Sequence, residues 1–574
     1  MIGLGCMRLS TAADRDDERS IAVIHAALDA GATLLDTADA YCHNEHDVGH
    51  NERLIARALD AWSGDRGGII VATKGGMRRP NGAWVMDGRA KNLREACEAS
   101  RHALGVDTIG LYQLHAVDPK TPIETSVRAL AKLQDEGKIR DIGLCNVTVS
   151  QIRAAQLLVR VAAVQVSLSP VDDENLRNGV AEYCRDNGIR LIAYRPLGGE
   201  RMKQLRRDAE LSRIASKHGA SNEEIVLAWL ASFDGVVAIP GATRIETAAS
   251  FARVQTITLD DGDRAALDAR FSGRLLRMPR AARRPRDDAG GEVIVVMGMP
   301  GAGKSGVARE HVAQGYQRLN RDALGGSLSE LAPRLEALLA GGAKRVVLDN
   351  TYPTRKSRNE VIETAWARGA SVRCIWLTTD VPNAQINAIR RMLDVHGSLP
   401  TPEEIRQLSK RDTRYLLPDA QFRYERSLEP PTVDEGFSSV EMREFVREPD
   451  SSEARALIMD FDDLVHRVRR EILERYRADG WLLFAHAWRP GWTDVAVCLA
   501  NMREQVGADV DVACCPHDAG PPVCWCRKPI PGSVLEFAMR RHVALAQSIV
   551  VGSSAADKTM AERIGARFTP CLSS

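Results

Sequence analysis

Residues 33–41 read TLLDTADAY, a short apolar run that ends in Asp36 and is followed by Tyr41. Apolar runs of this length between turn residues are typical of buried strands. Helical patterns such as ERSIAVIHAALDAG separate such runs, with apolar residues three and four positions apart and glycine at the end. Seven similar runs cover 1–6, 69–74, 109–115, 139–146, 161–169, 189–196 and 235–241. Eight strands, each followed by a helix, over about 250 residues predict a (β/α)8 barrel, the TIM-barrel fold, for residues 1–271.

Four polar residues of this region stand at or just after predicted strand ends. Asp36 ends the second strand, with Tyr41 shortly after it, while Lys74 ends the third strand and His115 the fourth. Because the carboxyl ends of barrel strands meet at one face, we expect these side chains to lie together. An ammonium group beside a phenol lowers the phenol pKa, a carboxylate keeps the ammonium charged, and an imidazole can orient a carbonyl oxygen. The four residues therefore predict one proton-donating site.

With these residues, the region 1–270 resembles the aldo-keto reductases, whose Asp-Tyr-Lys-His tetrad is complete here. The resemblance implies that Tyr41 is the general acid and that NADPH delivers hydride to an aldehyde or ketone. HNEHDVGH (43–50) holds three histidines, but its place beside the tetrad favours a substrate loop over a metal site.

The same resemblance implies where the cofactor binds. GKIRDIGLCN and the strand after it place Asn146 and Gln165 near the nicotinamide carboxamide, and AYRPLGG stacks Tyr194 on the nicotinamide. In IPGATRIE, Arg244 is expected to pair with the 2′-phosphate of NADP. The sequence departs from the family at Cys145 and Arg195, where serines are usual, and in the absence of a Glu-Asn pair after IPGATRIE. These departures leave the choice between NADP and NAD open.

Composition changes abruptly after the predicted barrel. SGRLLRMPRAARRPRDDAGG (272–291) is rich in Arg, Pro and Gly and has no apolar period, which predicts a linker over 272–290; its arginines are an alternative phosphate-binding patch. A second α/β unit is expected at 291–425, a connector at 426–454 and a third α/β unit at 455–574.

The second unit contains a nucleotide-binding motif. GMPGAGKS (298–305) follows the apolar run EVIVVMG and leads into a helical pattern, which is the strand-loop-helix context of a P-loop NTPase. Gly298, Gly301 and Gly303 would let backbone N–H groups surround phosphates at the helix N-terminus. Lys304 would bind the β- and γ-phosphates of ATP, and Ser305 would bind Mg²⁺.

The segments RLNRDALGG (318–326) and VVLDNTYPTRKSR (346–358) bear on the phosphate acceptor. Asp322 follows the second predicted strand, where a carboxylate can take the proton of an attacking hydroxyl. Together the segments resemble the kinase module of polynucleotide 5′-hydroxyl kinases. That resemblance implies that Asp322 is the general base and Arg390 the lid arginine, with Arg391 as the alternative; Asp349 is either near Mg²⁺ or structural. Kinases of small metabolites remain an alternative class.

In the last unit, ALIMDFDDLV (456–465) places Asp460 and Asp462 at the end of an apolar strand. One such carboxylate can attack a phosphoryl group while the other protonates the leaving group. The segment resembles the haloacid dehalogenase phosphatases, which have a Rossmann-like α/β fold. The resemblance implies that Asp460, Asp462 and Asp557 hold Mg²⁺ and that Lys528 binds the substrate phosphate.

The last unit departs from that family at two positions. Ser553 replaces a usual Mg²⁺-binding aspartate, and Ala487 falls where a phosphate-binding Ser or Thr is usual. Loss of an oxygen ligand weakens Mg²⁺ binding and slows attack by Asp460. We therefore expect either that Asp557 compensates or that the unit binds phosphate groups without hydrolysing them well.

The segment CCPHDAGPPVCWCRKP (514–529) holds Cys515, His517, Cys524 and Cys526. Short spacers let thiolate and imidazole ligands converge on a tetrahedral Zn²⁺ ion. Eight of the 12 cysteines are dispersed and no signal peptide pattern is present, so we expect a cytoplasmic chain with reduced thiols. The segment resembles the zinc clip of the histidinol-phosphate and heptose-bisphosphate phosphatases, which precedes Arg-Lys-Pro and would present Lys528 to the phosphate.

The totals agree with a multidomain globular chain. A chain of 574 residues is too long to fold around a single hydrophobic core. Its formal charge of +1 predicts no general attraction to nucleic acid. We interpret the chain as a multifunctional enzyme with a reductase, an ATP-dependent kinase and a phosphatase-like domain. By analogy, a kinase followed by a phosphatase is typical of enzymes that repair RNA or DNA ends. The alternatives are a metabolic fusion acting on one sugar-like molecule, or a last domain that only binds and guides the kinase.

Overall fold

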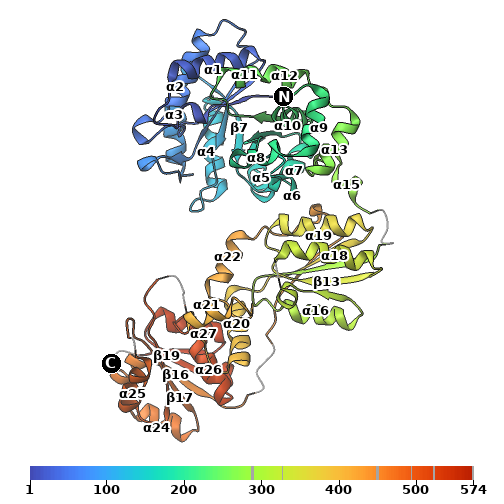
Figure 1. Cartoon of the computed structure of the whole chain (residues 1–574). Coiled ribbons are helices and arrows are strands. Elements are labelled where there is room, and N and C mark those ends of the chain that lie inside the picture. The colour runs from blue at the N-terminus through green and yellow to red at the C-terminus, as the bar shows by residue number, and fades with distance from the viewer. Residues whose placement is uncertain are drawn as a thin grey trace. The chain divides into compact units, whose positions relative to one another are not determined.

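The structure is a computed structural model that describes residues 1–285, 290–325, 327–447, 452–468, 470–492, 494–520 and 524–571. The chain forms two compact units, Met1–Arg284 and Pro285–Ser574 (Figure 1). In the described residues, no helix has both the length and the apolar character needed to cross a bilayer.

The first unit is a parallel eight-stranded barrel. Its strands pair in the order β1-β2-β3-β6-β7-β8-β9-β10, and a bridge between Ile2 and Ala238 brings the last strand back to the first. The barrel interior is filled by small and branched side chains of alternating strand positions, among them Leu34, Leu111 and Ile192. The strands are β1 (Leu4–Gly5), β2 (Leu34–Asp36), β3 (Ile70–Gly75), β6 (Ile109–Leu114), β7 (Ile139–Cys145), β8 (Val161–Ser167), β9 (Arg190–Tyr194) and β10 (Val236–Ile239). The expected barrel is confirmed.

Amphipathic helices surround the barrel (Figure 1). Side chains cap the N-termini of several of these helices. Asp16 accepts a hydrogen bond from Arg19 N at the start of α1, and Ser221 and Glu224 form a capping box at the start of α10. The larger helices are α1 (Asp17–Asp29), α2 (His50–Ala61), α3 (Ala90–Leu104), α4 (Ile123–Asp135), α5 (Val149–Gln156), α7 (Val180–Asp186), α9 (Ala209–His218), α10 (Asn222–Ala231) and α13 (Asp261–Arg270). A short hairpin, β4 (Met77–Arg78) and β5 (Val85–Met86), follows β3.

Part of the segment expected to be a linker is folded onto the barrel. Residues 272–284 contain α14 (Arg274–Arg277) and α15 (Arg280–Arg283). Glu182 of the barrel accepts hydrogen bonds from both Arg280 and Arg283, each at 2.9 Å. These arginines therefore neutralise a buried carboxylate, and Leu276 packs into the barrel core. Residues 286–289 of the expected linker lie outside the described residues.

The second unit begins with a five-stranded parallel sheet in the order β12-β13-β11-β14-β15. Its strands are β11 (Glu292–Met297), β12 (Gln317–Leu319), β13 (Arg345–Asp349), β14 (Ser371–Leu377) and β15 (Val440–Arg443). The last strand lies within 426–454, where only a connector was expected, so the sheet extends beyond residue 425. Its helices are α16 (Lys304–Ala313), α18 (Leu331–Ala340), α19 (Arg355–Ala367), α20 (Val381–His396), α21 (Pro402–Leu408) and α22 (Asp419–Ser427).

A second five-stranded parallel sheet follows in the same unit, in the order β18-β17-β16-β19-β20. The chain crosses from one side of β16 to the other, so the carboxyl end of β16 is a topological switch point, where ligands bind in open α/β sheets. The strands are β16 (Ala456–Asp460), β17 (Leu482–Trp488), β18 (Val510–Cys515), β19 (Ile549–Gly552) and β20 (Arg567–Pro570). The helices are α23 (Phe461–His466), α24 (Arg470–Ala478), α25 (Val495–Val506), α26 (Gly532–Arg541) and α27 (Ala555–Ile564).

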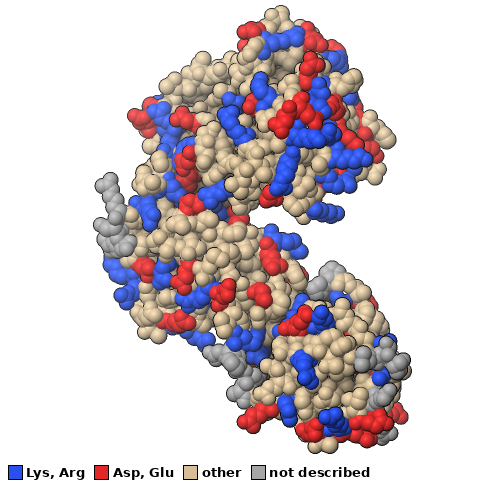
Figure 2. Space-filling view, turned by 180° about the vertical axis from the view of Figure 1, so that it is seen from behind, with Lys and Arg blue, Asp and Glu red and all other residues tan. Residues whose placement is uncertain are grey.

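Charged side chains of both signs are interspersed over the face shown in Figure 2. This distribution agrees with the near-zero formal charge of the chain.

Candidate functional site

The carboxyl face of the barrel brings the predicted tetrad together. Lys74 Nζ donates hydrogen bonds to the two carboxylate oxygens of Asp36, at 2.7 and 2.8 Å, and to the Tyr41 hydroxyl at 3.0 Å. The Tyr41 and His115 rings meet edge to face, with centroids 5.7 Å apart. All four side chains come from the ends of neighbouring strands, as the sequence predicted.

Burial and charge set the protonation states of this group. Burial raises the pKa of the Tyr41 hydroxyl above its usual range, and the Lys74 ammonium opposes that rise. Burial alone would lower the pKa of Lys74, but the Asp36 carboxylate holds it above its usual value. Burial, followed by the charge of Lys74, lowers the pKa of His115 to about 3. At neutral pH the site therefore holds a protonated phenol, a charged lysine and a neutral imidazole.

An aromatic side chain that sequence reasoning missed covers this group. Trp84 lies in the turn between β4 and β5, and its ring contacts the rings of Tyr41 and His115 edge to face, at 6.4 and 6.1 Å. The guanidinium of Arg79 lies 3.9 Å from the centre of the Trp84 ring. A tryptophan two residues after the Pro80-Asn81-Gly82 turn carries no local signal of function, so only the folded hairpin identifies it.

The loop that holds three histidines lines a cavity of about 620 Å³. Arg79 belongs to its lining and also donates hydrogen bonds to the carbonyls of Cys42 and His43, both at 3.2 Å. The cavity thus adjoins the tetrad through Arg79 and Trp84. Its lining consists of Thr11, His43, Asn44, Glu45, His46, Arg79, Asn81 and Gly82.

Three of the expected cofactor residues lie beside the tetrad. Gln165 Nε2 donates to Asp36 Oδ1 at 2.7 Å, and Asn146 Nδ2 donates to the His115 carbonyl at 3.2 Å. The Tyr194 hydroxyl donates to Asn146 Oδ1 at 2.9 Å. Asn146 and Arg195 each follow a barrel strand in a left-handed backbone conformation, which is uncommon outside functional sites. Arg244 is exposed at the start of the short helix α11 (Ile245–Ala249).

The P-loop has the backbone that its sequence predicted. Gly301 and Gly303 have φ angles of 89° and 94°, which favour glycine. A Cβ atom at Gly301 would lie 2.2 Å from the carbonyl oxygen of Ala384, so this position also requires glycine because α20 approaches so closely. Gly303 precedes α16 directly, and its N-cap position receives no side-chain hydrogen bond. The backbone N–H of Ala302 donates to the Met299 carbonyl and that of Gly306 to the Gly303 carbonyl, so the other N–H groups at this helix N-terminus are the candidates for phosphate oxygens.

The side chains of Lys304 and Ser305 donate hydrogen bonds to nearby oxygen atoms. Lys304 Nζ donates to the carbonyls of Gly298 and Met299, both at 2.8 Å, and burial lowers the pKa of Lys304 to about 8 although the charge of Asp349 opposes this. Ser305 Oγ donates to Asp349 Oδ2 at 3.2 Å. Arg318, which sequence reasoning missed, holds the same Asp349 carboxylate with hydrogen bonds of 2.6 and 2.9 Å.

Several charged residues affect the pKa of the P-loop lysine, among them Asp349, Arg391 and Asp322. The charges of Arg391 and Asp322 both act on the pKa of Lys304, and the charge of Asp322 also acts on that of Arg391. The charge of Arg390 instead acts on Arg447. Arg391 also shares a face of α20 with Asn387, whose Nδ2 donates to the Gly301 carbonyl at 2.9 Å, so the alternative lid arginine lies on the P-loop side of this helix.

In the last part of the chain, Asp460 lies at the carboxyl end of β16, at the topological switch point. Lys528 Nζ donates to Asp460 Oδ2 and to Asp557 Oδ1, both at 2.5 Å. Burial alone would lower the pKa of Lys528, but these carboxylates raise it above its usual value. Three residues expected to meet at this site are therefore in contact.

Two other predicted positions of this site have partners that the sequence did not indicate. Arg489 binds both carboxylate oxygens of Asp462, at 2.6 and 2.9 Å. Ser553 donates from its backbone N and its hydroxyl to the buried carboxylate of Asp463, at 2.7 and 3.0 Å. Each carboxylate thus has a protein partner where a metal would need open oxygen ligands.

The residue opposite Asp460 on β17 is His486, and Ala487 is the next residue in the strand. His486 Nε2 lies 2.9 Å from the Cys526 carbonyl, and burial together with the charge of Lys528 lowers the pKa of His486 to about 4. A buried, neutral imidazole therefore stands at this strand end.

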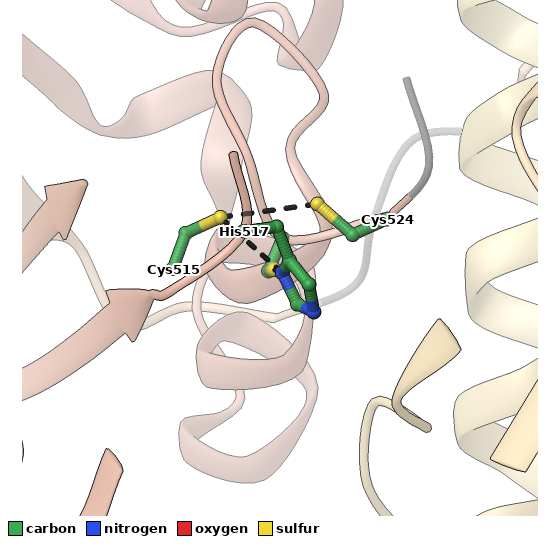
Figure 3. Close-up of side chains that lie close together, drawn as sticks. Cys515, His517 and Cys524 are labelled. Carbon is green, nitrogen blue, oxygen red and sulfur yellow. Dashed lines mark hydrogen bonds between the residues drawn. The ribbon is translucent and has the colours of Figure 1, made fainter. Parts of the chain in front are cut away.

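Cys515, His517, Cys524 and Cys526 converge near the end of β18. Figure 3 shows the first three of them. Cys515 Sγ lies 3.8 Å from Cys524 Sγ and 3.6 Å from His517 Nδ1, and Cys526 Sγ lies 3.3 Å from the same nitrogen. Sulfur ligands about 2.3 Å from a tetrahedral Zn²⁺ ion stand roughly 3.8 Å apart. The donor set and its spacing therefore fit Zn²⁺.

Comparisons with known proteins match two parts of the chain. Residues 1–270 match the model of the aldo/keto reductase family, and residues 293–409 match that of an AAA domain. Aldo-keto reductase str7 of Strobilurus tenacellus is 33% identical over 285 residues, which cover 44% of this chain and 81% of that protein. Among solved structures, a thermostable aldo-keto reductase, Tm1743, has 29% identity and a TM-score of 0.41, with 47% of this chain and 94% of that chain covered.

A Klebsiella pneumoniae aldo-keto reductase solved with NADPH has 25% identity and a TM-score of 0.40, over 47% of this chain and 90% of that chain. The match to str7 spans most of that protein, and Asp36, Tyr41, Lys74 and His115 meet at the carboxyl face of the barrel. Through its N-terminal unit, the chain therefore belongs to the aldo-keto reductase family.

Proposed function

We propose that the barrel reduces an aldehyde or ketone with NADPH and that Tyr41 protonates the carbonyl oxygen. The observation that carries this proposal is the contact of Lys74 with both Asp36 and the Tyr41 hydroxyl. A charged lysine stabilises the phenolate that forms when Tyr41 gives up its proton. His115 Nδ1 is buried and has no protein partner within the described residues, so it can accept or donate a hydrogen bond to the substrate.

The residues present fit a nicotinamide cofactor. The side-chain amides of Asn146 and Gln165 lie at neighbouring strand ends, and the half-buried Tyr194 ring adjoins them. Exposed Arg244 is available for the 2′-phosphate. When bound, NADPH supplies the hydride; the protein residues hold the amide, orient the carbonyl and donate the proton.

The polar lining of the cavity beside Arg79 favours a polar carbonyl substrate, because apolar groups would leave these side chains without hydrogen-bond partners. NADPH consumption with a panel of short aldehydes and sugar-like carbonyls tests this proposal in the full chain. Tyr41→Phe should abolish consumption, whereas Lys304→Ala should leave it unchanged because that residue belongs to the other unit. Undiminished turnover by Tyr41→Phe would refute the assigned role.

We also propose that the P-loop domain transfers the γ-phosphoryl group of ATP to a hydroxyl group. Lys304 and the loop N–H groups would bind the phosphates, Ser305 and Asp349 would hold Mg²⁺, and Asp322 would accept the proton of the attacking hydroxyl. For Asp349 to bind Mg²⁺, Arg318 must release it, so Arg318 becomes available to the phosphates.

A polynucleotide 5′-hydroxyl is the acceptor that we propose, because 42% of the Asp322 side chain is exposed and a large molecule can reach it. Transfer from γ-labelled ATP to a 5′-hydroxyl oligonucleotide tests this acceptor, with a small sugar alcohol as the competitor. Labelling of the alcohol but not of the oligonucleotide would instead favour a metabolic kinase. Asp322→Asn should remove the transfer to either acceptor.

For the last part of the chain we propose a haloacid dehalogenase-like fold with a structural Zn²⁺ ion and a phosphate-binding site at Asp460. The strand order, the place of Asp460 and the contacts of Lys528 support this proposal. Because Arg489 and Ser553 hold the neighbouring carboxylates, we infer that phosphate binding outweighs hydrolysis. Phosphate release from a 3′-phosphorylated oligonucleotide that disappears in Asp460→Asn would overturn that inference.

A further inference from the structure

We propose that Trp525 is a positioning residue for the P-loop site. It lies between two members of the Cys/His cluster and holds the chain at 414–416, which in turn holds Arg391. Two parts of the second unit, the Cys/His cluster and the nucleotide site, are thereby coupled through α20. The proposal rests on the phosphotransferase function proposed above.

One face of α20 lies on the P-loop. Asn387 Nδ2 donates to the Gly301 carbonyl at 2.9 Å, and the backbone at Ala384 leaves no room for a Cβ atom at Gly301. Arg391 lies one helical turn further on, and after burial its positive charge is one of the causes that lower the pKa of Lys304. Ala384, Asn387 and Arg391 are three and four residues apart, so they share one face of the helix.

The opposite face of α20 lies on the last part of the chain. Ile386, Ile389 and Leu393 have the same spacing but are displaced by two residues, which corresponds to roughly 200° around a helix. They belong to one hydrophobic core with Trp525 and with residues of α26. Gln385 Oε1, also in α20, accepts a hydrogen bond of 3.1 Å from Arg563 of α27. Figure 1 shows α20 and α21 beside α26 and α27. The helix is therefore shared by both sites.

Trp525 connects the Cys/His cluster to the loop that follows α21. Its indole is 1% exposed, and Nε1 donates to the Leu416 carbonyl at 2.8 Å. Two residues earlier, the Arg414 carbonyl accepts a hydrogen bond of 3.2 Å from Arg391. Because Cys524 and Cys526 flank Trp525, closing the cluster around a metal fixes its backbone on both sides.

The consequence concerns the transfer step more than nucleotide binding. The glycine backbone of the P-loop binds phosphates without Arg391, whereas an arginine beside Lys304 stabilises the charge that develops on the transferred group. Within the described residues, Nε of Arg391 is buried with no hydrogen-bond partner, so the guanidinium has a donor left for a ligand. Loosening 414–416 should therefore lower kcat and leave the KM for ATP nearly unchanged.

Trp525→Phe in the full chain tests this connection, because it removes the indole N–H but keeps an aromatic ring in the core. The matched control is Trp481→Phe, since Trp481 packs on Tyr476 in a separate core away from α20. We would measure hydrogen exchange of the amides in 410–417, metal content, the KM for ATP and kcat for transfer to the 5′-hydroxyl oligonucleotide. We expect Trp525→Phe to exchange the amides of 410–417 faster and to have about a fivefold lower kcat, because the loss of one hydrogen bond has an effect of this size. Trp481→Phe should change neither quantity.

Removing the metal from the wild-type chain with a chelator provides a second measurement that needs no substitution. It should accelerate exchange in 410–417 in the same way, and zinc should reverse the effect. Exchange that is unchanged both by chelation and by Trp525→Phe would overturn the proposal. If the wild-type chain transfers no phosphate at all, the phosphotransferase function fails, but the exchange measurements still decide whether Trp525 links the cluster to 414–416.

Discussion

Lys74 Nζ lies 3.0 Å from the Tyr41 hydroxyl oxygen, and the lysine is completely buried with Asp36 as its counter-ion. We expect Lys74→Met to lower kcat for carbonyl reduction by about 10²–10³-fold, because the phenolate then loses its nearest positive charge. The buried Asp36 would also lose its partner, at a cost of roughly 3–5 kcal/mol in the free energy of unfolding. NADPH consumption and chemical denaturation measure the two effects. Asp36→Asn/Lys74→Met should recover part of the stability and none of the activity.

The pH dependence of reduction should be flat through neutrality. The pKa of His115 is lowered to about 3, so its imidazole stays neutral above about pH 4, and Tyr41, with a raised pKa, keeps its proton beyond its usual value near 10. Neither residue therefore changes charge between about pH 4 and 10. We expect the kcat/KM of the wild-type enzyme to show no inflection near pH 6.5. The contrary result would be an inflection there that is present in the wild-type enzyme and absent in His115→Gln. Such an inflection would show that His115 is charged in the free enzyme.

Binding of ATP should weaken as pH rises above 8. Burial lowers the pKa of Lys304 to about 8 in the nucleotide-free protein, so the side chain loses its proton through this range. The neutral amine attracts phosphates less, and binding between pH 8 and 10 must be accompanied by proton uptake. Calorimetry in buffers of different ionisation enthalpy measures that uptake. Lys304→Arg should remove it, because an arginine stays charged at every pH in the range.

The residues that sequence reasoning located stand at strand ends or in a motif of fixed spacing. Asp36, Lys74 and His115 end three neighbouring strands of a closed barrel, so their meeting follows from the topology. Trp84 and Arg489 carried no such signal. Trp84 reaches the tetrad only because a hairpin folds over it, and Arg489 pairs with Asp462 across 27 residues of chain. The choice of Arg391 over Arg390 likewise depends on how α20 is rotated, which two adjacent arginines in the sequence cannot reveal.

Loss of the metal should destabilise the second unit and spare the barrel. Cys515→Ser removes one of four donors that lie within 4.8 Å of one another. A ligand bound at a concentration about 100-fold above its Kd contributes roughly 3 kcal/mol to the free energy of unfolding, which corresponds to a Tm lower by about 6–12 °C for a domain of this size. Elemental analysis and calorimetry of the full chain measure both effects. Cys571→Ser is the control, because this cysteine lies outside the cluster; equal metal content in both variants would exclude a metal site at Cys515.

In the phosphate site proposed above, Ser553 stands where the family resemblance would place a magnesium-binding aspartate. Its two hydrogen bonds to Asp463 keep that buried carboxylate satisfied. We expect Ser553→Asp to lower the Tm by several degrees in the presence of a chelator, because the new carboxylate then lies beside the buried carboxylate of Asp463. Mg²⁺ should restore the Tm by binding between them, while the wild-type chain should respond little to the ion. Ser553→Asn is the matched control, since it has the same shape without the charge. A wild-type Tm that rises with Mg²⁺ as strongly as that of Ser553→Asp would show that the natural site already holds the metal, and hydrolysis at Asp460 would then become the expected activity.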